Sequence, residues 1–259
     1  CVRCNRYIKF GPFLEKAAAL GASRLATGHH ARVEEDSSGA GYVLRKGVDR
    51  SKDQSYFLYV LSQAELSRTL MPVGGLTKEE VRQRARGAGS HVSERPESQD
   101  VCFVPDGDMA AFLRMMNPAA VSPGPIEDQE GNVLGTHQGV ALYTIGQRSG
   151  LGLAGPRPRY VLRIDAERNA VVVGDGEALY RSDLSATDLN WIAGAAPGRR
   201  FQARAKIRYA AEPAPCEVTT DGDSMRVFFE NPQRAIAPGQ SVVLYDGDRV
   251  LGGGVIESP

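Results

Sequence analysis

The chain has 259 residues, and its 31 basic and 31 acidic side chains give a formal net charge of zero at pH 7. This balance gives no global argument for nucleic-acid binding, so any basic surface must be local. Hydrophobic residues make up 42% of the chain, enough for a proper core, and no apolar run is long enough to cross a membrane. Four cysteines without dense, even spacing are unlike a secreted disulfide scaffold, and we expect a cytoplasmic protein.

Three of the four cysteines lie in two short stretches. Cys1 and Cys4 form a C-x-x-C, and Cys102 lies within Gln99–Phe103. Two sulfurs at this spacing can share a metal, form a redox disulfide or act as nucleophile and helper. The spacing by itself favours a structural zinc half-site or two inert thiols. A thioredoxin-type module is disfavoured, because its C-x-x-C should follow a strand in a β-α-β unit.

The first part of the chain alternates short helices and strands. Pro12 and Gly21 bracket an alanine-rich helix over 13–20, and the polar stretch 34–41 predicts a hairpin loop.

A strand is predicted over 23–27, and we expect it to be buried. It ends at Gly28 and His29, and open α/β sheets bind ligands at the carboxyl ends of their strands. A simple turn with solvated histidines is the alternative.

Ser51 is predicted to cap a helix that runs to Leu61, with Lys52, Asp53 and Gln54 in its first turn. The free N–H groups and positive end of a helix attract phosphate. Ordinary helix-start chemistry also explains these residues.

Two capping boxes, Ser62 with Glu65 and Thr77 with Glu80, predict two further helices. The second is predicted to stop at Gly89. It carries four basic residues, and such a group usually forms a face of the helix exposed to solvent. They are Lys78, Arg82, Arg84 and Arg86.

Residues 108–176 predict a small, mostly β module. It opens with an amphipathic helix over 109–116, whose apolar side is formed by Ala111, Phe112, Met115 and Met116. Turn residues at 130–132 and 174–176 indicate hairpins. The paired strands are expected over 160–165 and 170–174.

Residues 180–259 predict an all-β barrel, with turns at 221–222 and 246–247. Alternation along 202–209 puts Gln202, Arg204, Lys206 and Arg208 on one face and Ala203, Ala205, Ile207 and Tyr209 on the other. A face with three cations suits an RNA backbone, and solvent exposure without a partner explains it almost as well. Cys216 is expected in the core.

An ordered set of short runs resembles the tRNA-specific 2-thiouridylases, the MnmA/TrmU family. The runs are Cys1–Phe10, Ala26–His29, Ser51–Leu58, Cys102–Phe103, Tyr143–Arg148 and Leu251–Gly254. The resemblance implies a multidomain α/β plus β fold. Its parts are the C-terminal part of a PP-loop ATPase domain of the adenine-nucleotide α-hydrolase type (1–107), a mostly-β central domain (108–176) and a tRNA-binding β-barrel (180–259).

The resemblance also implies an activity, the ATP-dependent 2-thiolation of the wobble uridine of Lys, Glu and Gln tRNAs. Cys102 would carry a persulfide received from a sulfur-relay donor protein. Cys4 would be the nucleophile that helps release this sulfur and would end disulfide-bonded to Cys102. Gly28 would contact the nucleotide. The tRNA contacts would be His29, Lys52, Asp53, Gln54, Arg208, Tyr209 and Gln240.

The sequence departs from the family pattern in two ways. No S-G-G-x-D-S-type phosphate loop is present. We therefore expect a C-terminal three-quarters fragment that is inactive by itself, with most of the ATP and Mg²⁺ site upstream.

The second departure is Cys1, where many members carry Asp. Cys1, Cys4 and Cys102 together could ligate a 4Fe–4S cluster with one open iron. Two alternatives stay open: a cluster-dependent thiolase acting on another tRNA base, and a non-catalytic RNA-binding module with a structural metal.

Overall fold

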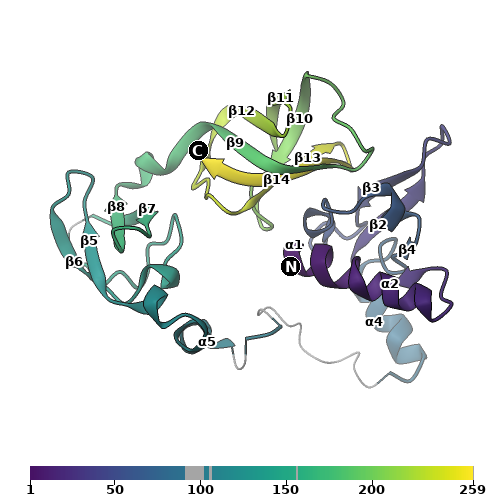
Figure 1. Cartoon of the computed structure of the whole chain (residues 1–259), viewed down its shortest axis with the longest axis horizontal. Helices are drawn as coiled ribbons and strands as arrows, with labels where there is room; N and C mark the ends of the chain where they lie inside the picture. Colours follow the sequence, from purple (N-terminus) through teal and green to yellow (C-terminus); the bar gives the residue numbers. More distant parts are fainter. Residues whose placement is uncertain (91–101, 105–106, 156, 259) are drawn as a thin grey trace. The chain divides into compact units, whose positions relative to one another are not determined.

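The computed structural model describes residues 1–90, 102–104, 107–155 and 157–258. The chain forms two compact units (Figure 1). The first consists of residues 1–95, 182–231 and 238–259, and the second of residues 96–181 and 232–237.

The first unit begins with three consecutive helical segments. They are α1 (Val2–Cys4), the π-helix η1 (Asn5–Lys9) and α2 (Pro12–Ala19). Pro12 occupies the start of α2, where its missing N–H costs nothing, so the predicted helix is confirmed. A two-residue strand, β1 (Leu25–Ala26), pairs in parallel with β4 (Thr69–Leu70). The prediction of a buried strand here is wrong, because this short pair leaves Leu25 half-buried and Ala26 exposed.

The hairpin of β2 (Ala31–Glu35) and β3 (Tyr42–Lys46) is confirmed. The helix predicted from Ser51 to Leu61 is wrong, because a turn and the short 3₁₀-helix η2 (Ser55–Phe57) occupy this stretch. The Asp53 carboxylate accepts hydrogen bonds from the backbone N–H groups of Gly47 and Ser55, at 3.0 Å each. A side chain that bonds nearby backbone in this way competes with helix formation.

The two capping boxes are confirmed at α3 (Gln63–Leu66) and α4 (Lys78–Gly87). In each, the Ser or Thr hydroxyl accepts from the N3 backbone while the N3 glutamate accepts from the N-cap N–H. Gly89 follows α4 with a positive φ of 70°.

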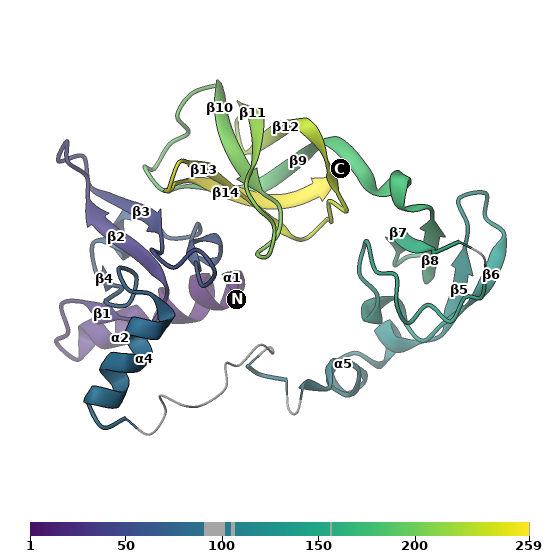
Figure 2. The same ribbon diagram turned by 180° about the vertical axis from the view of Figure 1, so that it is seen from behind.

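Six long strands close the C-terminal barrel in the order β13-β10-β11-β12-β9-β14, with β14 returning to β13 (Figures 1 and 2). Their bounds are β9 (Tyr180–Trp191), β10 (Arg200–Lys206), β11 (Ala214–Asp221), β12 (Ser224–Arg234), β13 (Ser241–Asp246) and β14 (Arg249–Ser258). The turns at 221–222 and 246–247 are confirmed. Of the residues predicted to share one face, Ala205 and Ile207 are buried and Ala203 is half-buried, whereas Tyr209 is 38% exposed.

The barrel and the N-terminal segment share one sheet and one core. Strand β14 pairs with β3 through Arg249 and Arg45, which extends the barrel sheet to β2. One buried cluster combines N-terminal side chains such as Leu44 and Tyr59 with Val243 and Tyr245 of β13. The two parts therefore depend on each other for burial of their apolar surface.

The second unit is built on a four-stranded sheet with the order β6-β5-β8-β7. Its elements are α5 (Met109–Met116), η5 (Pro118–Val121), β5 (Gly124–Glu127), β6 (Val133–His137), η6 (Val140–Leu142), β7 (Tyr160–Asp165), β8 (Ala170–Gly174) and η7 (Gly176–Leu179). The paired strands β7 and β8 and the turn at 130–132 are confirmed. The hairpin expected at 174–176 is wrong, because β9 pairs with β12 and β14 and not with β8. The apolar side predicted for α5 is not buried, since Met115 is 71% and Met116 64% exposed.

Candidate active site and nucleic-acid interface

Cys1 and Cys4 lie on a single helical turn. Cys1 is the N-cap of α1, Cys4 is its last residue, and the Asn5 N–H donates to the Cys1 carbonyl at 2.9 Å. Residues three apart lie on the same side of a helix. Cys1 is exposed and Cys4 half-buried, and both are free thiols. This turn can therefore present two thiols to one ligand or to one another.

The segment after Cys4 is a π-helix, a rare conformation that is frequent at functional sites. Asn5 is 1% exposed and donates through Nδ2 to the Phe57 carbonyl at 2.9 Å. Arg6 forms an ion pair of 2.8 Å with Asp188 of the barrel strand β9. These two contacts hold the cysteine turn against η2 and the barrel.

A cavity of about 440 Å³ begins where the π-helix ends. Its lining contains three of the predicted site residues, Gly28, His29 and Gln54, and the remaining lining residues are Lys9, Phe13 and Thr27. Gln54 accepts a hydrogen bond from the His30 N–H at 2.9 Å. Lys9 and Phe13 were not among the residues predicted from the sequence. Lys9 lies near the end of the Cys1–Phe10 run, and this position could have indicated that Lys9 belongs to the site.

His29 is a neutral base in this cavity at pH 7. It is 8% exposed, its Nδ1 lies 2.9 Å from the Thr27 hydroxyl, and its ring centroid lies 5.9 Å from that of Phe10. Burial, together with the positive charge of Lys9, lowers the pKa of His29 to about 4. A neutral imidazole with one nitrogen paired to Thr27 keeps its other nitrogen for a substrate.

We expect His29 to remain neutral from pH 8 to pH 5. Because its folded pKa is below the unfolded value of 6.5, the unfolded chain binds more protons between pH 6.5 and 4, and stability falls as the pH drops through this window. NMR titration of the histidine Cε1 protons measures the pKa. Lys9→Met should raise it, whereas Lys16→Met, a control on the exposed side of α2, should not. A His29 pKa near 6.5 would contradict this account of the site.

The two other predicted contacts from this stretch have different surroundings. Asp53 is 5% exposed, and its second oxygen accepts from the Ser55 hydroxyl at 2.9 Å, so protein donors already bind both carboxylate oxygens. Lys52 is half-buried. Contact of Asp53 and Lys52 with tRNA stays a prediction.

An aromatic stack joins the barrel to η2. The rings of Tyr209 and Phe57 lie 4.6 Å apart at 28°, and Tyr56 meets Phe57 edge-on. The Phe57 N–H bonds the Gln54 carbonyl, so this stack adjoins the stretch that lines the cavity. Arg208 is half-buried and Gln240 exposed. The structure thus places Tyr209 beside the Gln54 segment, and sequence reasoning did not foresee Phe57.

Cys102 is exposed and belongs to the second unit. The preceding Gln99, Asp100 and Val101 lie outside the described residues. All four thiols are free, so the Cys4–Cys102 disulfide is not formed in this structure. Among the residues that the structure describes, no group of three or more His, Cys, Asp or Glu side chains gathers to hold a metal ion. No described helix is long and apolar enough to span a membrane.

Comparison with known proteins gives a consistent result along the whole chain. Three family models match in order: the tRNA methyl transferase HUP domain at residues 1–106, the tRNA methyl transferase PRC-barrel domain at 111–175 and the aminomethyltransferase beta-barrel domain at 181–256. The chain is 51% identical to a tRNA-specific 2-thiouridylase MnmA of Heliobacterium modesticaldum, over 99% of its length and 67% of the relative's. It is 50% identical to an MnmA of Chloroflexus aggregans, over 100% of its length and 72% of the relative's. The chain belongs to the MnmA family.

Membership confirms the predicted multidomain fold, an α/β HUP domain, a PRC-barrel and a closed C-terminal β-barrel. A relative from Symbiobacterium thermophilum, also named a tRNA-specific 2-thiouridylase MnmA, is 52% identical over 99% of this chain and 66% of its own length. The chain therefore spans about two thirds of the length of these relatives.

The four cysteines should differ sharply in reactivity. Cys216 is buried, its Sγ donates to the Ala203 carbonyl at 3.4 Å, and burial raises its pKa to about 12. The thiolate is the reactive form, so Cys216 should resist thiol reagents at pH 8 while Cys1, Cys4 and Cys102 react. Titration with DTNB (5,5′-dithiobis-2-nitrobenzoate) measures this. Cys216→Ala should leave the native thiol count unchanged and lower only the denatured count, and rapid native labelling of Cys216 would contradict its placement in the core.

Proposed function

We propose that this protein takes part in the 2-thiolation of the wobble uridine of tRNA. One observation carries the proposal. The Cys1–Cys4 turn continues directly into the π-helix, and the last residue of that helix, Lys9, lines the cavity of Gly28, His29 and Gln54. Thiols on a helical turn that leads to a cavity with a neutral base suit sulfur transfer to a base taken out of its stack. Relatives named for the same activity support the substrate.

The proposed reaction has two parts. ATP supplies the activation, because adenylation turns the C2 oxygen of uridine into a leaving group. The terminal sulfur of a Cys102 persulfide then bonds to C2 and AMP departs. Cys4 then attacks the Cys102 sulfur of the resulting Cys102–S–S–C2 adduct, so that the S–S bond breaks and 2-thiouridine leaves. The Cys4–Cys102 disulfide that remains must be reduced by a cellular dithiol. A sulfur-relay protein of the cytoplasm would reload Cys102.

The cavity residues fit the edge of a nucleotide site. A Cβ built on Gly28 would meet no atom within 4 Å, so the backbone of Gly28 is open to a ligand. Lys9 adds a positive charge to the same cavity. We infer that Gly28 borders the nucleotide, that Lys9 offsets phosphate charge and that His29 contacts the target nucleoside. The remaining tRNA contacts proposed are Lys52, Asp53, Gln54, Arg208, Tyr209 and Gln240.

A cluster-dependent thiolase is the second candidate. The single turn that carries Cys1 and Cys4 favours it, because this turn supplies two thiolates on one side of a helix. Cys102 would be the third ligand, and the cluster would supply an open iron for hydrosulfide.

The proposal is tested by expressing the complete open reading frame in a bacterial strain that lacks its own 2-thiouridylase. Mass spectrometry of digested tRNA then measures 2-thiouridine. Restored 2-thiouridine supports the proposal. Absence of 2-thiouridine in a strain that makes the protein in stable, soluble form would contradict it.

A further inference from the structure

A second cavity, of about 630 Å³, lies between the β2–β3 hairpin and the barrel within the first unit. Its walls come from β2 and β3, the loop after β3, strand β10 and the turn between β13 and β14. Five of the lining side chains are cationic, Arg32, Lys46, Arg50, Arg204 and Lys206, and three are anionic, Asp53, Glu212 and Asp248. Cavities of this size ordinarily hold small ligands or parts of larger ones.

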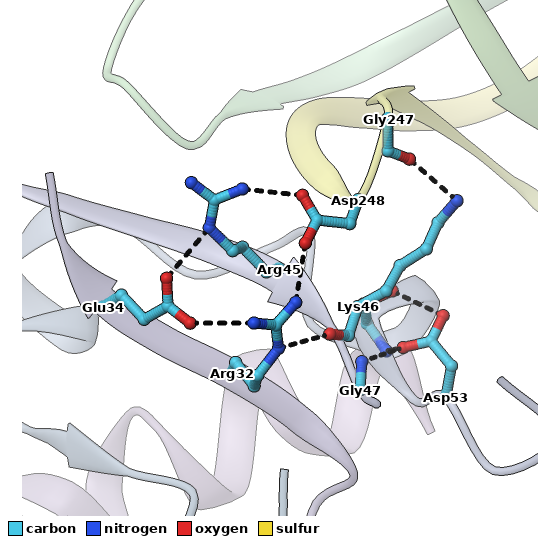
Figure 3. A network of polar contacts seen from close by, with 9 residues as sticks. Arg32, Glu34, Arg45, Lys46, Gly47, Asp53, Gly247 and Asp248 are labelled. Carbon is cyan, nitrogen blue, oxygen red and sulfur yellow. Dashed lines mark hydrogen bonds and ion pairs between the residues drawn. The ribbon is translucent and has the colours of Figure 1, made fainter. Parts of the chain in front are cut away.

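Two of the three carboxylates are already committed to protein partners. Asp248 pairs with Arg32 and Arg45 at 2.6 Å each, as Figure 3 shows. Asp53 accepts from Gly47 and Ser55, as described above. Because Arg32 and Asp248 pair with each other, four cations, Lys46, Arg50, Arg204 and Lys206, face the two carboxylates of Asp53 and Glu212, so the cavity carries excess positive charge.

The two lysines are held in place by neutral groups. The Lys46 ammonium donates to the Gly247 carbonyl at 3.1 Å (Figure 3). It also lies 4.3 Å from the ring centre of Tyr245. The Lys206 ammonium lies 5.4 Å from the ring centre of Tyr209. Burial lowers the pKa of both lysines, and the negative charges of Asp53 and Glu212 oppose this shift. The charge of Lys206 lowers the pKa of Lys46 further. Two partly desolvated ammonium groups that repel each other gain most from an anion placed between them.

We propose that this cavity binds a backbone phosphate of the RNA substrate through Lys46 and Lys206. The proposal rests on the proposed function, because it takes the RNA to be the tRNA that is thiolated. A strand of RNA fits better than a free anion, since Lys206 also borders the Tyr209–Phe57 stack. Aromatic platforms beside cationic grooves are the usual surface for single-stranded nucleic acid, which offers a phosphate and a base together.

The test measures binding of unmodified tRNA to the chain by fluorescence anisotropy at several salt concentrations. The double variant K46Q/K206Q should lower the slope of log Kd against log salt by about 0.7–0.9, which is roughly a five- to eightfold loss of affinity at 0.1 M salt. Charge-preserving K46R/K206R should keep most of the slope. Arg200→Gln removes a cation from the same strand, where Arg200 pairs with Glu217 and is 71% exposed, and should leave the slope unchanged.

The outcomes distinguish failure of the cavity assignment from failure of the proposed function. If the parent chain does not bind tRNA, the proposed function fails with it. If the parent binds and K46Q/K206Q, shown to be folded by near-ultraviolet circular dichroism, keeps the same slope, only the cavity assignment is overturned. A ³¹P NMR titration with inorganic phosphate separates the two sources of phosphate. Phosphate bound by the parent but not by K46Q/K206Q, with unchanged tRNA affinity, would make the cavity a free-anion site and overturn the RNA assignment.

Discussion

Replacing Cys4 or Cys102 by serine is expected to lower 2-thiouridine formation by more than about 10³-fold, because a hydroxyl cannot carry or accept the transferred sulfur. Cys216→Ser is the matched control. Cys216 is buried in the barrel and bonded to the Ala203 carbonyl, and its replacement should leave formation near the parental level. The measurement is 2-thiouridine content in the deletion strain that carries each variant.

Cys1 decides between the two sulfur-transfer routes. If a Cys102 persulfide supplies the sulfur, Cys1→Ser should retain most of the activity. If a cluster supplies it, all three serine variants should lose activity together with about four irons per chain, measured after anaerobic purification. Full activity of Cys4→Ser would contradict both routes.

Replacing Tyr245 by alanine should give the largest loss of stability, about 3–5 kcal/mol, in line with other large-to-small core changes. Tyr245 is 0% exposed, its hydroxyl lies 3.2 Å from that of Ser55, and its ring lies beneath the Lys46 ammonium. Its removal opens a cavity where the barrel meets β3 and η2. Urea unfolding followed by the fluorescence of Trp191, the chain's single tryptophan, reports on this unit.

Two variants sharpen this stability test. Tyr245→Phe keeps the ring and loses one hydrogen bond, so it should cost about 1 kcal/mol. Leu20→Ala, at a residue of the same unit that is 78% exposed, should change stability by less than about 0.5 kcal/mol. Equal effects of Tyr245→Ala and Leu20→Ala would show that the shared core is wrongly assigned.

Local signals in the sequence were reliable where neighbouring residues alone determine the structure. The Ser62–Glu65 and Thr77–Glu80 capping boxes are closed by bonds within four residues. The helix predicted at Ser51 failed because the Asp53 carboxylate bonds Gly47 and Ser55 inside a buried site. No local pattern around Ser51 indicates that burial.

The site was predictable only in part for a similar reason. Gly28, His29 and Gln54 could be named from their runs, but their meeting in one cavity depends on how η1 and η2 pack. The cavity of Lys46 and Lys206 depends on pairing of β14 with β3, which joins residues some two hundred positions apart. A contact between residues so far apart in sequence cannot be predicted from the alternation of polar and apolar residues in either strand.

The most direct measurement is the position of sulfur in tRNA. Lys, Glu and Gln tRNAs from the deletion strain that expresses the complete open reading frame are cut with a ribonuclease, and the fragments are sequenced by mass spectrometry. The account predicts 2-thiouridine at the first anticodon position in the parent and its absence in Cys4→Ser and Cys102→Ser. Sulfur at any other nucleoside, or at the wobble uridine in all three strains alike, would contradict it.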